Sequence, residues 1–292
     1  MSTIVLLLIT GLGLGALYFL VASGLSLIYG LMGVLNFAHG SFLTLGAFIG
    51  WEVARRLSDG TWWTLGASMI AGAIIGAAFA AATEFFLIRP LYLRHIEQVL
   101  VTVGLALASV ALFEGIWGTD PIYVVNPEWL GLTTEILGAR IPNSRFLLIG
   151  CAALVLLAIV LFLKHTRYGL IIRAGVENRS MVTALGIDVR RAFTLVFAIG
   201  GAAAGLGGVL ASVYYGYVSA HIGGSLLIFA FIVTVIGGLG SLAGAAVASV
   251  LVAVLQQFAN YYLWGTGDLA VVLALAAVLL IRPQGLMGKS VR

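Results

Sequence analysis

The sequence contains little charge, little proline and almost no cysteine. Only 9% of its 292 residues are charged, whereas 62% are hydrophobic, and the mean hydropathy is +1.14. Soluble globular proteins carry roughly 25% charged residues, because polar side chains must cover a surface that faces water. The composition therefore excludes an ordinary soluble enzyme and indicates a chain whose outer surface faces lipid.

The scarcity of cysteine and proline excludes further classes of protein. The single cysteine, Cys151, can form neither an internal disulfide nor a cysteine-based zinc site. The 5 prolines and 38 glycines do not indicate disorder, because the glycines are dispersed among apolar runs, as in closely packed membrane helices. No group of side chains suited to a metal is visible. We therefore expect no metal site and no cofactor within this chain.

The sequence does contain nine apolar runs. A helix needs ~20 apolar residues to cross the ~30 Å hydrocarbon core of a membrane, and backbone groups inside lipid must be paired, so such runs become helices. Several runs are short or are joined without a polar gap, which is typical of discontinuous or re-entrant segments. The sequence predicts an all-α, polytopic transmembrane bundle of about eight spans, between seven and nine, in one domain over residues 1–292. The runs lie near residues 4–28, 29–50, 62–87, 99–118, 146–163, 192–213, 225–240, 241–262 and 268–281.

The basic residues predict which loops face the cytoplasm. Six of the 15 Lys and Arg residues lie in 164–191, and positively charged loops face the cytoplasm. The net charge of +4 is confined to such gaps and does not indicate nucleic-acid binding. Alternation along the chain then places the gap at 119–145 outside and the gap at 89–97 inside. The same alternation places Arg55 and Arg56 outside, and this conflict leaves the side of the amino terminus open.

The external gap at 119–145 divides the chain into two helical halves, 1–118 and 146–292. Each half contains one run that is interrupted by glycine, at 30–41 and at 237–241. Paired interruptions of this kind are the best sequence indication of a transporter's substrate path, where half-helix ends meet the substrate near the membrane midplane. The alternative is that the glycines only allow close helix packing. The residues predicted to line the path are Asn36, His39, Ser41, Gly237, Gly240 and Ser241.

Several ionisable residues also lie in or near the apolar runs. Most of them, including Glu84, Glu114 and Asp268, lie close to a predicted run end, where their side chains can reach the headgroup region. His39 is the exception, since it follows Asn36 by three residues inside a run, and the two share a face if the segment is helical. No acid lies near His39 to complete a catalytic set. The sequence therefore predicts no catalytic residues.

The predicted cytoplasmic segment 164–191 has a helical pattern. Between 171 and 185, small and apolar residues recur at helical spacing, and charged residues fall on another face. Such a helix can lie on the membrane or dock into a groove of a partner protein. A solvated connector fits the pattern equally well, so the residues alone leave these possibilities open.

A false match to a nucleotide-binding motif is also informative. Residues 285–290 (Gly-Leu-Met-Gly-Lys-Ser) end like a phosphate-binding loop, but the first glycine of that motif would stand at position 283, which is Pro283. Without a phosphate-binding loop, the chain is not expected to hydrolyse ATP on its own.

Four segments carry a family resemblance. They are 24–41 (from Gly-Leu-Ser-Leu-Ile-Tyr-Gly to Asn-Phe-Ala-His-Gly-Ser), 169–187 (from Gly-Leu-Ile-Ile-Arg to Ala-Leu-Gly-Ile), 237–244 (Gly-Gly-Leu-Gly-Ser-Leu-Ala-Gly) and 282–286 (Arg-Pro-Gln-Gly-Leu). In this order, and nearly from end to end, the chain resembles the membrane permeases of branched-chain amino acid ABC importers, in particular the LivH type. Permeases for urea and short amides look similar, so the resemblance implies the family more specifically than the substrate.

The resemblance implies an α-helical subunit that is multi-pass in the inner membrane of a bacterial or archaeal cell and is not an enzyme. Its implied partners are a second related permease, often of LivM type, a periplasmic or lipid-anchored substrate-binding protein, and two cytoplasmic ATPase subunits that bind the ATP. The coupling loop of the family corresponds here to residues 173–187. The positions expected to couple to the ATPases are Arg173, Glu177, Asn178, Arg179 and Gly186.

The implied function is import of branched-chain amino acids by alternating access, in which ATP-driven movement of separate subunits opens the path to each side in turn. The alternatives are an ABC permease for urea or short amides, and a self-sufficient secondary transporter or channel. A secondary transporter would need a chain of charged residues at the midplane for ion coupling, which the runs lack. An intramembrane enzyme would need a nucleophile with a base, or a metal set, and neither is visible.

Overall fold

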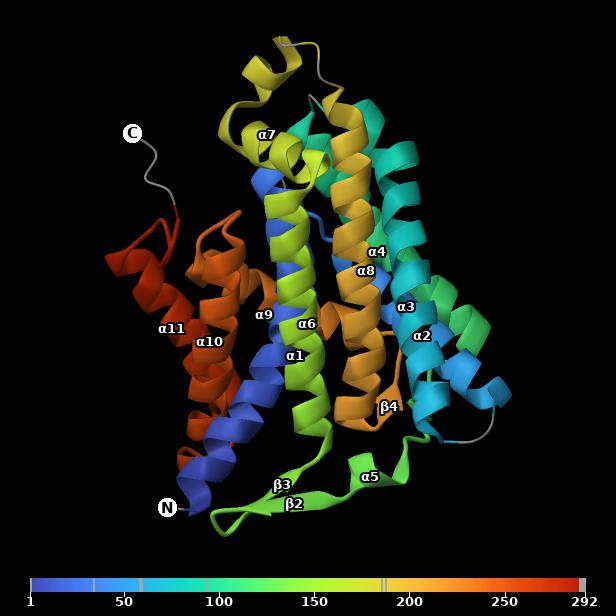
Figure 1. The fold of residues 1–292 in the computed structure, drawn as a ribbon, viewed down its shortest axis with the longest axis vertical. Coiled ribbons are helices and arrows are strands. Elements are labelled where there is room, and N and C mark those ends of the chain that lie inside the picture. Colours follow the sequence, from blue (N-terminus) through green and yellow to red (C-terminus); the bar gives the residue numbers. More distant parts are fainter. Residues whose placement is uncertain are drawn as a thin grey trace.

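The computed structural model describes residues 2–33, 35–57, 60–92, 94–184, 186 and 188–288, and the side chains of all of these except residues 176–180 and 183. The chain forms a bundle of long helices with two small antiparallel sheets at one end (Figure 1). The helices of the bundle are α1 (Ser2–Met32), α2 (His39–Leu57), α3 (Trp62–Thr83), α4 (His95–Trp117), α6 (Ser144–His165), α8 (Val189–Tyr215), α9 (Ile222–Gly237), α10 (Leu242–Tyr262) and α11 (Gly267–Ile281).

The shorter elements lie in the connections. A π-helical turn, η1 (Glu84–Ile88), and a 3-10 turn, η2 (Arg89–Leu91), continue α3. One sheet pairs β1 (Ile122–Tyr123) with β4 (Tyr217–Val218), so that Ile122 lies opposite Val218. The other is the hairpin of β2 (Thr133–Ile136) and β3 (Ala139–Pro142), which follows the single turn α5 (Glu128–Gly131). The remaining helix, α7 (Arg167–Ala184), joins α6 to α8.

The predicted polytopic helical membrane bundle is confirmed. Among the described residues, six helices (α1, the continuous α3–η1–η2 segment, α4, α6, α8 and α10) are long and apolar enough to cross a membrane, and α9 and α11 are shorter apolar helices. One predicted boundary is wrong: the runs at 4–28 and 29–50 do not meet at residue 28, because α1 continues to Met32. The break comes after it, where Gly33 has a left-handed φ of +68° that ends the helix.

Burial separates the central helices from those that face lipid. In the most apolar window, 61% of α1 and 67% of α8 are buried, compared with 17% for α4 and 22% for α6. Leu17, Leu20 and Leu25 of α1 have no exposed surface at all. Since the side chains of α4 and α6 are apolar yet exposed, these helices supply the surface that meets the hydrocarbon.

Glycine allows the central helices to approach one another closely. On α3 and α8, the pairs Gly72/Gly76 and Gly201/Gly205 face each other, and a Cβ atom on any of the four would collide with the other helix, at Val209 Cγ2 for Gly72 and at backbone or a Cβ atom for the other three. Both pairs have the spacing of two glycines separated by three residues, which places them on one helix face. These glycines therefore allow the close helix packing that the dispersion of glycine among the apolar runs indicates.

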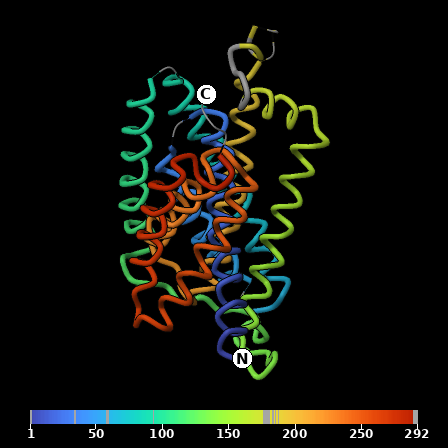
Figure 2. Tube along the Cα trace, turned by 90° about the vertical axis from the view of Figure 1, so that its left-hand side faces the viewer, coloured from blue at the N-terminus to red at the C-terminus, as the bar shows by residue number. Residues whose placement is uncertain are grey.

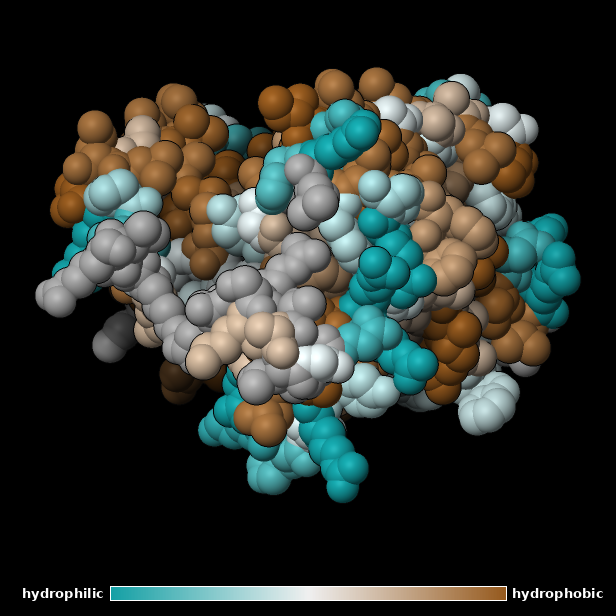
Figure 3. Space-filling model, turned by 90° about the horizontal axis from the view of Figure 1, so that it is seen from above, coloured by the Kyte–Doolittle hydropathy of each residue, from teal (hydrophilic) through white to brown (hydrophobic). Residues whose placement is uncertain are grey.

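The two ends of the bundle differ in charge. One end holds α7, the α3–α4 connection and the carboxyl-terminal segment, and the other holds the start of α1 and the β2–β3 hairpin (Figures 1 and 2). Seen from the α7 end, hydrophilic side chains spread across the face while the rim is hydrophobic (Figure 3). The positive-inside rule predicts that this end faces the cytoplasm and that α1 starts outside, and the two ends are named accordingly. At the outer end Glu52 pairs with Arg55 and Arg56, at 2.7 and 2.8 Å, and offsets their charge.

Candidate functional site

The interruption between helices α1 and α2 lies inside the bundle. The Asn36 side chain accepts a hydrogen bond from the Ala38 backbone N–H, at 3.1 Å, and α2 begins directly afterwards at His39. His39 is fully buried, and its Nε2 lies 3.0 Å from the carbonyl oxygen of Val21, well before the end of α1. Ser41, in the first turn of α2, is 5% exposed. Because α2 starts beside the middle of α1, it is a half-helix whose amino terminus lies within the membrane.

A second break, between α8 and α9, meets the first one. Gly216 ends α8 with a left-handed φ of +79°, and α9 starts again at Ile222 after β4. The Gly223 N–H donates to Thr44 Oγ1 of α2, at 3.1 Å, and a Cβ atom on Gly40 would lie 2.7 Å from the Gly223 carbonyl oxygen. The amino-terminal turns of α2 and α9 are therefore in contact inside the bundle.

The predicted runs 192–213 and 225–240 leave a gap at this second break, but its place in the site was not predicted. The available signal was the glycine and polar content of 216–225, between the predicted runs 192–213 and 225–240, which resembles the interruption at 30–41 in kind. The decisive contact joins residues that are far apart in the chain, Thr44 and Gly223, so only the fold brings them together.

The geometry at the two breaks suits an anionic group. Each helix amino terminus carries unpaired N–H groups and a partial positive charge, and half-helix termini of this kind hold the carboxylates of transported substrates. Two buried polar atoms here, Asn36 Nδ2 and His39 Nδ1, have no hydrogen-bond partner among the described residues. They are polar groups that a molecule entering this region could hydrogen-bond.

The other predicted path residues lie at a different level. Gly237, Gly240 and Ser241 form the turn from α9 to α10, in which Ser241 Oγ accepts from the Gly244 N–H at 3.0 Å. The carboxyl-terminal segment closes over this turn, and the Met287 N–H donates to the Gly237 carbonyl at 3.0 Å. This turn lies at the cytoplasmic end, apart from His39, and a role in lining the path stays a prediction for all six residues.

The two glycine-interrupted segments do approach each other. A Cβ atom on Gly30, near the end of α1, would lie 3.1 Å from the Cα atom of Gly240. The end of α1 therefore lies against the α9–α10 turn, just before Gly33 ends the helix. The paired interruptions are therefore neighbours in the fold, although the helix starts that meet at the centre are those of α2 and α9.

The segment predicted to couple to a partner is a helix at the cytoplasmic end. The helix expected over 171–185 is present as α7, which begins earlier, at Arg167, and ends at Ala184. Ile172 and Val182 are buried, and Gly175 lies against Leu31 at the end of α1.

The predicted coupling residues divide into described and undescribed side chains. Arg173 is exposed, and Gly186 is exposed in the turn after α7 with a φ of +76°. The side chains of Glu177, Asn178 and Arg179 lie outside the described residues, although their backbone belongs to α7. Helix α7 therefore has one face packed on the bundle and another open to a partner.

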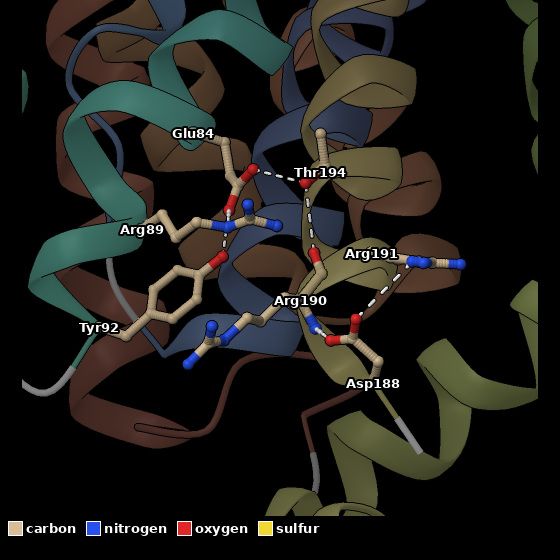
Figure 4. A network of polar contacts seen from close by, with 7 residues as sticks. All are labelled: Glu84, Arg89, Tyr92, Asp188, Arg190, Arg191 and Thr194. Carbon is tan, nitrogen blue, oxygen red and sulfur yellow. Dashed lines mark hydrogen bonds and ion pairs between the residues drawn. The ribbon is translucent and has the colours of Figure 1, made fainter.

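A polar network lies at the start of α8, which follows α7 in the chain (Figure 4). Asp188 caps α8 by accepting from the Arg190 N–H at 3.0 Å. Thr194 Oγ1 donates to Glu84 Oε2 at 2.6 Å, and the Tyr92 hydroxyl donates to Glu84 Oε1. Burial and the Glu84 carboxylate raise the pKa of Tyr92 above its ordinary value, so Tyr92 stays a donor at neutral pH.

The expectation that Glu84 reaches the headgroup region is wrong. Its side chain has no exposed surface, and Arg89 Nε lies 3.8 Å from its carboxylate. The π-helical turn at Glu84–Ile88 directs the carboxylate toward α8 instead of toward lipid. No local pattern indicates this, because the partners Tyr92 and Thr194 come from separate segments.

Comparison with known proteins identifies the family. Residues 7–282 match the model of the branched-chain amino acid transport system permease component family. The LivH permease of the high-affinity branched-chain amino acid transport system of Salmonella typhimurium is 29% identical over 96% of this chain and 94% of that protein. The BraD permease of the corresponding system of Pseudomonas aeruginosa is 29% identical, over 97% of this chain and 95% of that protein.

A second type of permease is also related. The LivM permease of the Escherichia coli high-affinity branched-chain amino acid transport system is 27% identical over 93% of this chain and 68% of that protein. The permease homologues and the apolar helices together indicate a multi-pass protein of the inner membrane. The chain therefore belongs to the family of permease components of branched-chain amino acid transport systems.

Proposed function

We propose that this chain is one membrane subunit of a binding-protein-dependent ABC importer that carries branched-chain amino acids inward by alternating access. The observation that carries the proposal is the position of α7, a helix at the basic end of the bundle with an exposed face. The chain has no nucleotide-binding motif, so the energy has to come from separate ATPase subunits. A second permease related to LivM and a substrate-binding protein complete the proposed assembly.

Helix α7 is attached to the bundle in a way that suits force transfer. It continues α6 on one side and leads into α8 on the other, and its Gly175 rests on Leu31 of α1. A partner that binds the exposed face at Arg173 and moves would displace the cytoplasmic ends of α1, α6 and α8 together. Since α1 and α8 are the central helices, their movement would change the path between the two half-helices.

The proposed path runs past the amino termini of α2 and α9. A zwitterionic amino acid would place its carboxylate toward these positive helix ends and its ammonium toward backbone carbonyls. Asn36 and His39 would then hydrogen-bond the substrate with the atoms that have no partner in the closed bundle. The apolar residues around the break would accept the aliphatic side chain.

Charge reversal at Arg173 tests the coupling role of α7. In the complete transporter, Arg173→Glu is expected to reduce co-purification of the ATPase subunits and to lower ATP-driven leucine uptake into proteoliposomes by about tenfold, the effect of losing roughly 1.4 kcal/mol of interaction. Arg94→Glu is the matched control, because Arg94 is also exposed at the cytoplasmic end but lies on the α3–α4 connection. Equal loss in both variants, or in neither, would contradict the assignment to α7.

Competition identifies the substrate class. Leucine, isoleucine and valine are expected to inhibit uptake of labelled leucine by the wild-type complex, while urea and acetamide in the same excess leave it unchanged, because neither provides a carboxylate for the helix termini. Stronger inhibition by urea or acetamide would favour an amide permease. Uphill transport by this chain alone, without ATPase subunits, would instead favour a secondary transporter.

A further inference from the structure

Glu84 is a buried carboxylate in a helix that crosses the membrane, and its position calls for an explanation. Its side chain has no exposed surface, although it lies in a segment that is otherwise apolar. Removing a carboxylate from water costs several kcal/mol even in a relaxed protein, and an apolar side chain of the same volume often stabilises a fold better. A π-helical turn is also a rare feature that is frequent at functional sites.

The partners of Glu84 come from three segments. Thr194 lies in the second turn of α8 and donates to Glu84 at 2.6 Å, while Tyr92 donates from the connection to α4. Arg89, at 3.8 Å, supplies a positive charge from η2. One carboxylate therefore joins the end of α3, the α3–α4 connection and the start of α8 (Figure 4).

The position of Thr194 relates this junction to α7. The single hydroxyl hydrogen of Thr194 is shared between Glu84 and the Arg190 carbonyl oxygen, which lies 3.2 Å from Thr194 Oγ1 in the first turn of α8, and Asp188 caps that turn. Gly186, two residues before the cap and two after the end of α7 at Ala184, has a left-handed φ of +76°. Any displacement of α7 therefore reaches α8 within a few residues of the hydrogen bond to Glu84.

The rest of the contact between α3 and α8 differs in kind. It includes the glycine pairs Gly72/Gly76 and Gly201/Gly205, which meet backbone and apolar side chains such as Ala80 and Val209. Such a contact holds the helices close but provides no directional bond. A hydrogen bond to an ionised carboxylate is directional and about twice as strong as one between neutral groups.

We propose that Glu84 is a positioning residue that makes the start of α8 and the end of α3 move as one body when α7 is displaced. This inference rests on the proposed ATPase coupling through α7 and names the place where that movement enters α3 and the connection to α4. Its loss is expected to separate ATP hydrolysis from transport, since the ATPases would still move α7 while α3 would no longer follow.

The test measures uptake per ATP hydrolysed by the complete transporter in proteoliposomes. Glu84→Gln keeps the size of the side chain but replaces one acceptor oxygen with an NH2 group and removes the charge that pairs with Arg89. Thr194→Val removes the hydroxyl donor on α8. Both are expected to lower leucine uptake per ATP by about tenfold, as the loss of one charged hydrogen bond predicts, with ATP hydrolysis retained. Thr194→Ser, which keeps the hydroxyl, is expected to restore the wild-type ratio.

Glu114→Gln is the matched control, because Glu114 is also a membrane-helix carboxylate but pairs with His221 at the outer end, at 3.0 Å. Its ratio of uptake to ATP hydrolysed is expected to equal that of the wild type. An unchanged ratio in Thr194→Val overturns the inference, as does a proportional loss of both activities with a lower melting temperature, which marks a purely structural role. If the wild-type complex shows no ATP-driven uptake, the proposed function fails first.

Discussion

Valine in place of Gly205 is expected to leave little folded protein in the membrane. A Cβ atom on Gly205 would overlap the Gly72 carbonyl oxygen and lie 3.1 Å from the Gly76 Cα atom. Both obstacles are backbone atoms of α3, which cannot move aside by a change of rotamer. Overpacking of this kind costs about 3 kcal/mol, which lowers the melting temperature by roughly 10 °C in a chain of this size. Size-exclusion chromatography and thermal unfolding in detergent measure the effect.

The same substitution on a lipid-facing helix is the control. Gly104 lies in α4, and a Cβ atom there has nothing within 4 Å outside its own helix. Because glycine and valine differ in helix propensity equally at both positions, the difference between the variants reports the packing between α3 and α8. Equal yields and melting temperatures for Gly205→Val and Gly104→Val would contradict the view that these helices need backbone contact.

Alanine at both Asn36 and His39 is expected to reduce leucine uptake by at least about tenfold while the complex still assembles and hydrolyses ATP. Two substrate hydrogen bonds of about 1 kcal/mol each would be lost, which corresponds to more than tenfold in affinity or rate. The measurement is uptake into proteoliposomes against substrate concentration, with assembly and the melting temperature checked on the same preparation.

The control for this pair is His95→Ala, because His95 is exposed at the start of α4, away from the α1–α2 break. His39 also contacts the Val21 carbonyl oxygen, so its loss could disturb the packing of α1 and α2. The single variant Asn36→Ala is therefore measured as well, because the Asn36 side chain hydrogen-bonds only the nearby Ala38 N–H among the described residues. Wild-type uptake by the assembled single and double variants would show that the α1–α2 break shapes the helix start and does not line the path.

Much of the fold follows from residues that act locally. Inside a membrane, the backbone must form its own hydrogen bonds, so an apolar run becomes a helix whatever its neighbours are. For this reason the nine predicted runs correspond to nine helices, and the amphipathic pattern after 171 corresponds to α7. The boundary between α1 and α2 was misplaced because apolar residues continue through 29–32, and the conformation of Gly33 ends α1.

The site depended on contacts between distant segments. Asn36 and His39 were recognisable as polar residues in an apolar run, but the carboxyl-proximal partner of that break was assigned to Gly237 and Gly240. The tertiary structure instead joins α2 to the start of α9, through Thr44 and Gly223. No periodicity in the sequence reports such a contact, since each segment alone is compatible with ordinary helix packing.

The sequence by itself determined that the chain is a membrane bundle and that a further helix joins two of its spans, because hydropathy and helical spacing are local properties of the chain. Only the tertiary structure decided which helix starts meet at the centre and that Glu84 points to Thr194 instead of to the headgroups. Those outcomes depend on how closely glycine-bearing helices approach and on the turn of the chain at η1, which are properties of packed pairs and not of single segments.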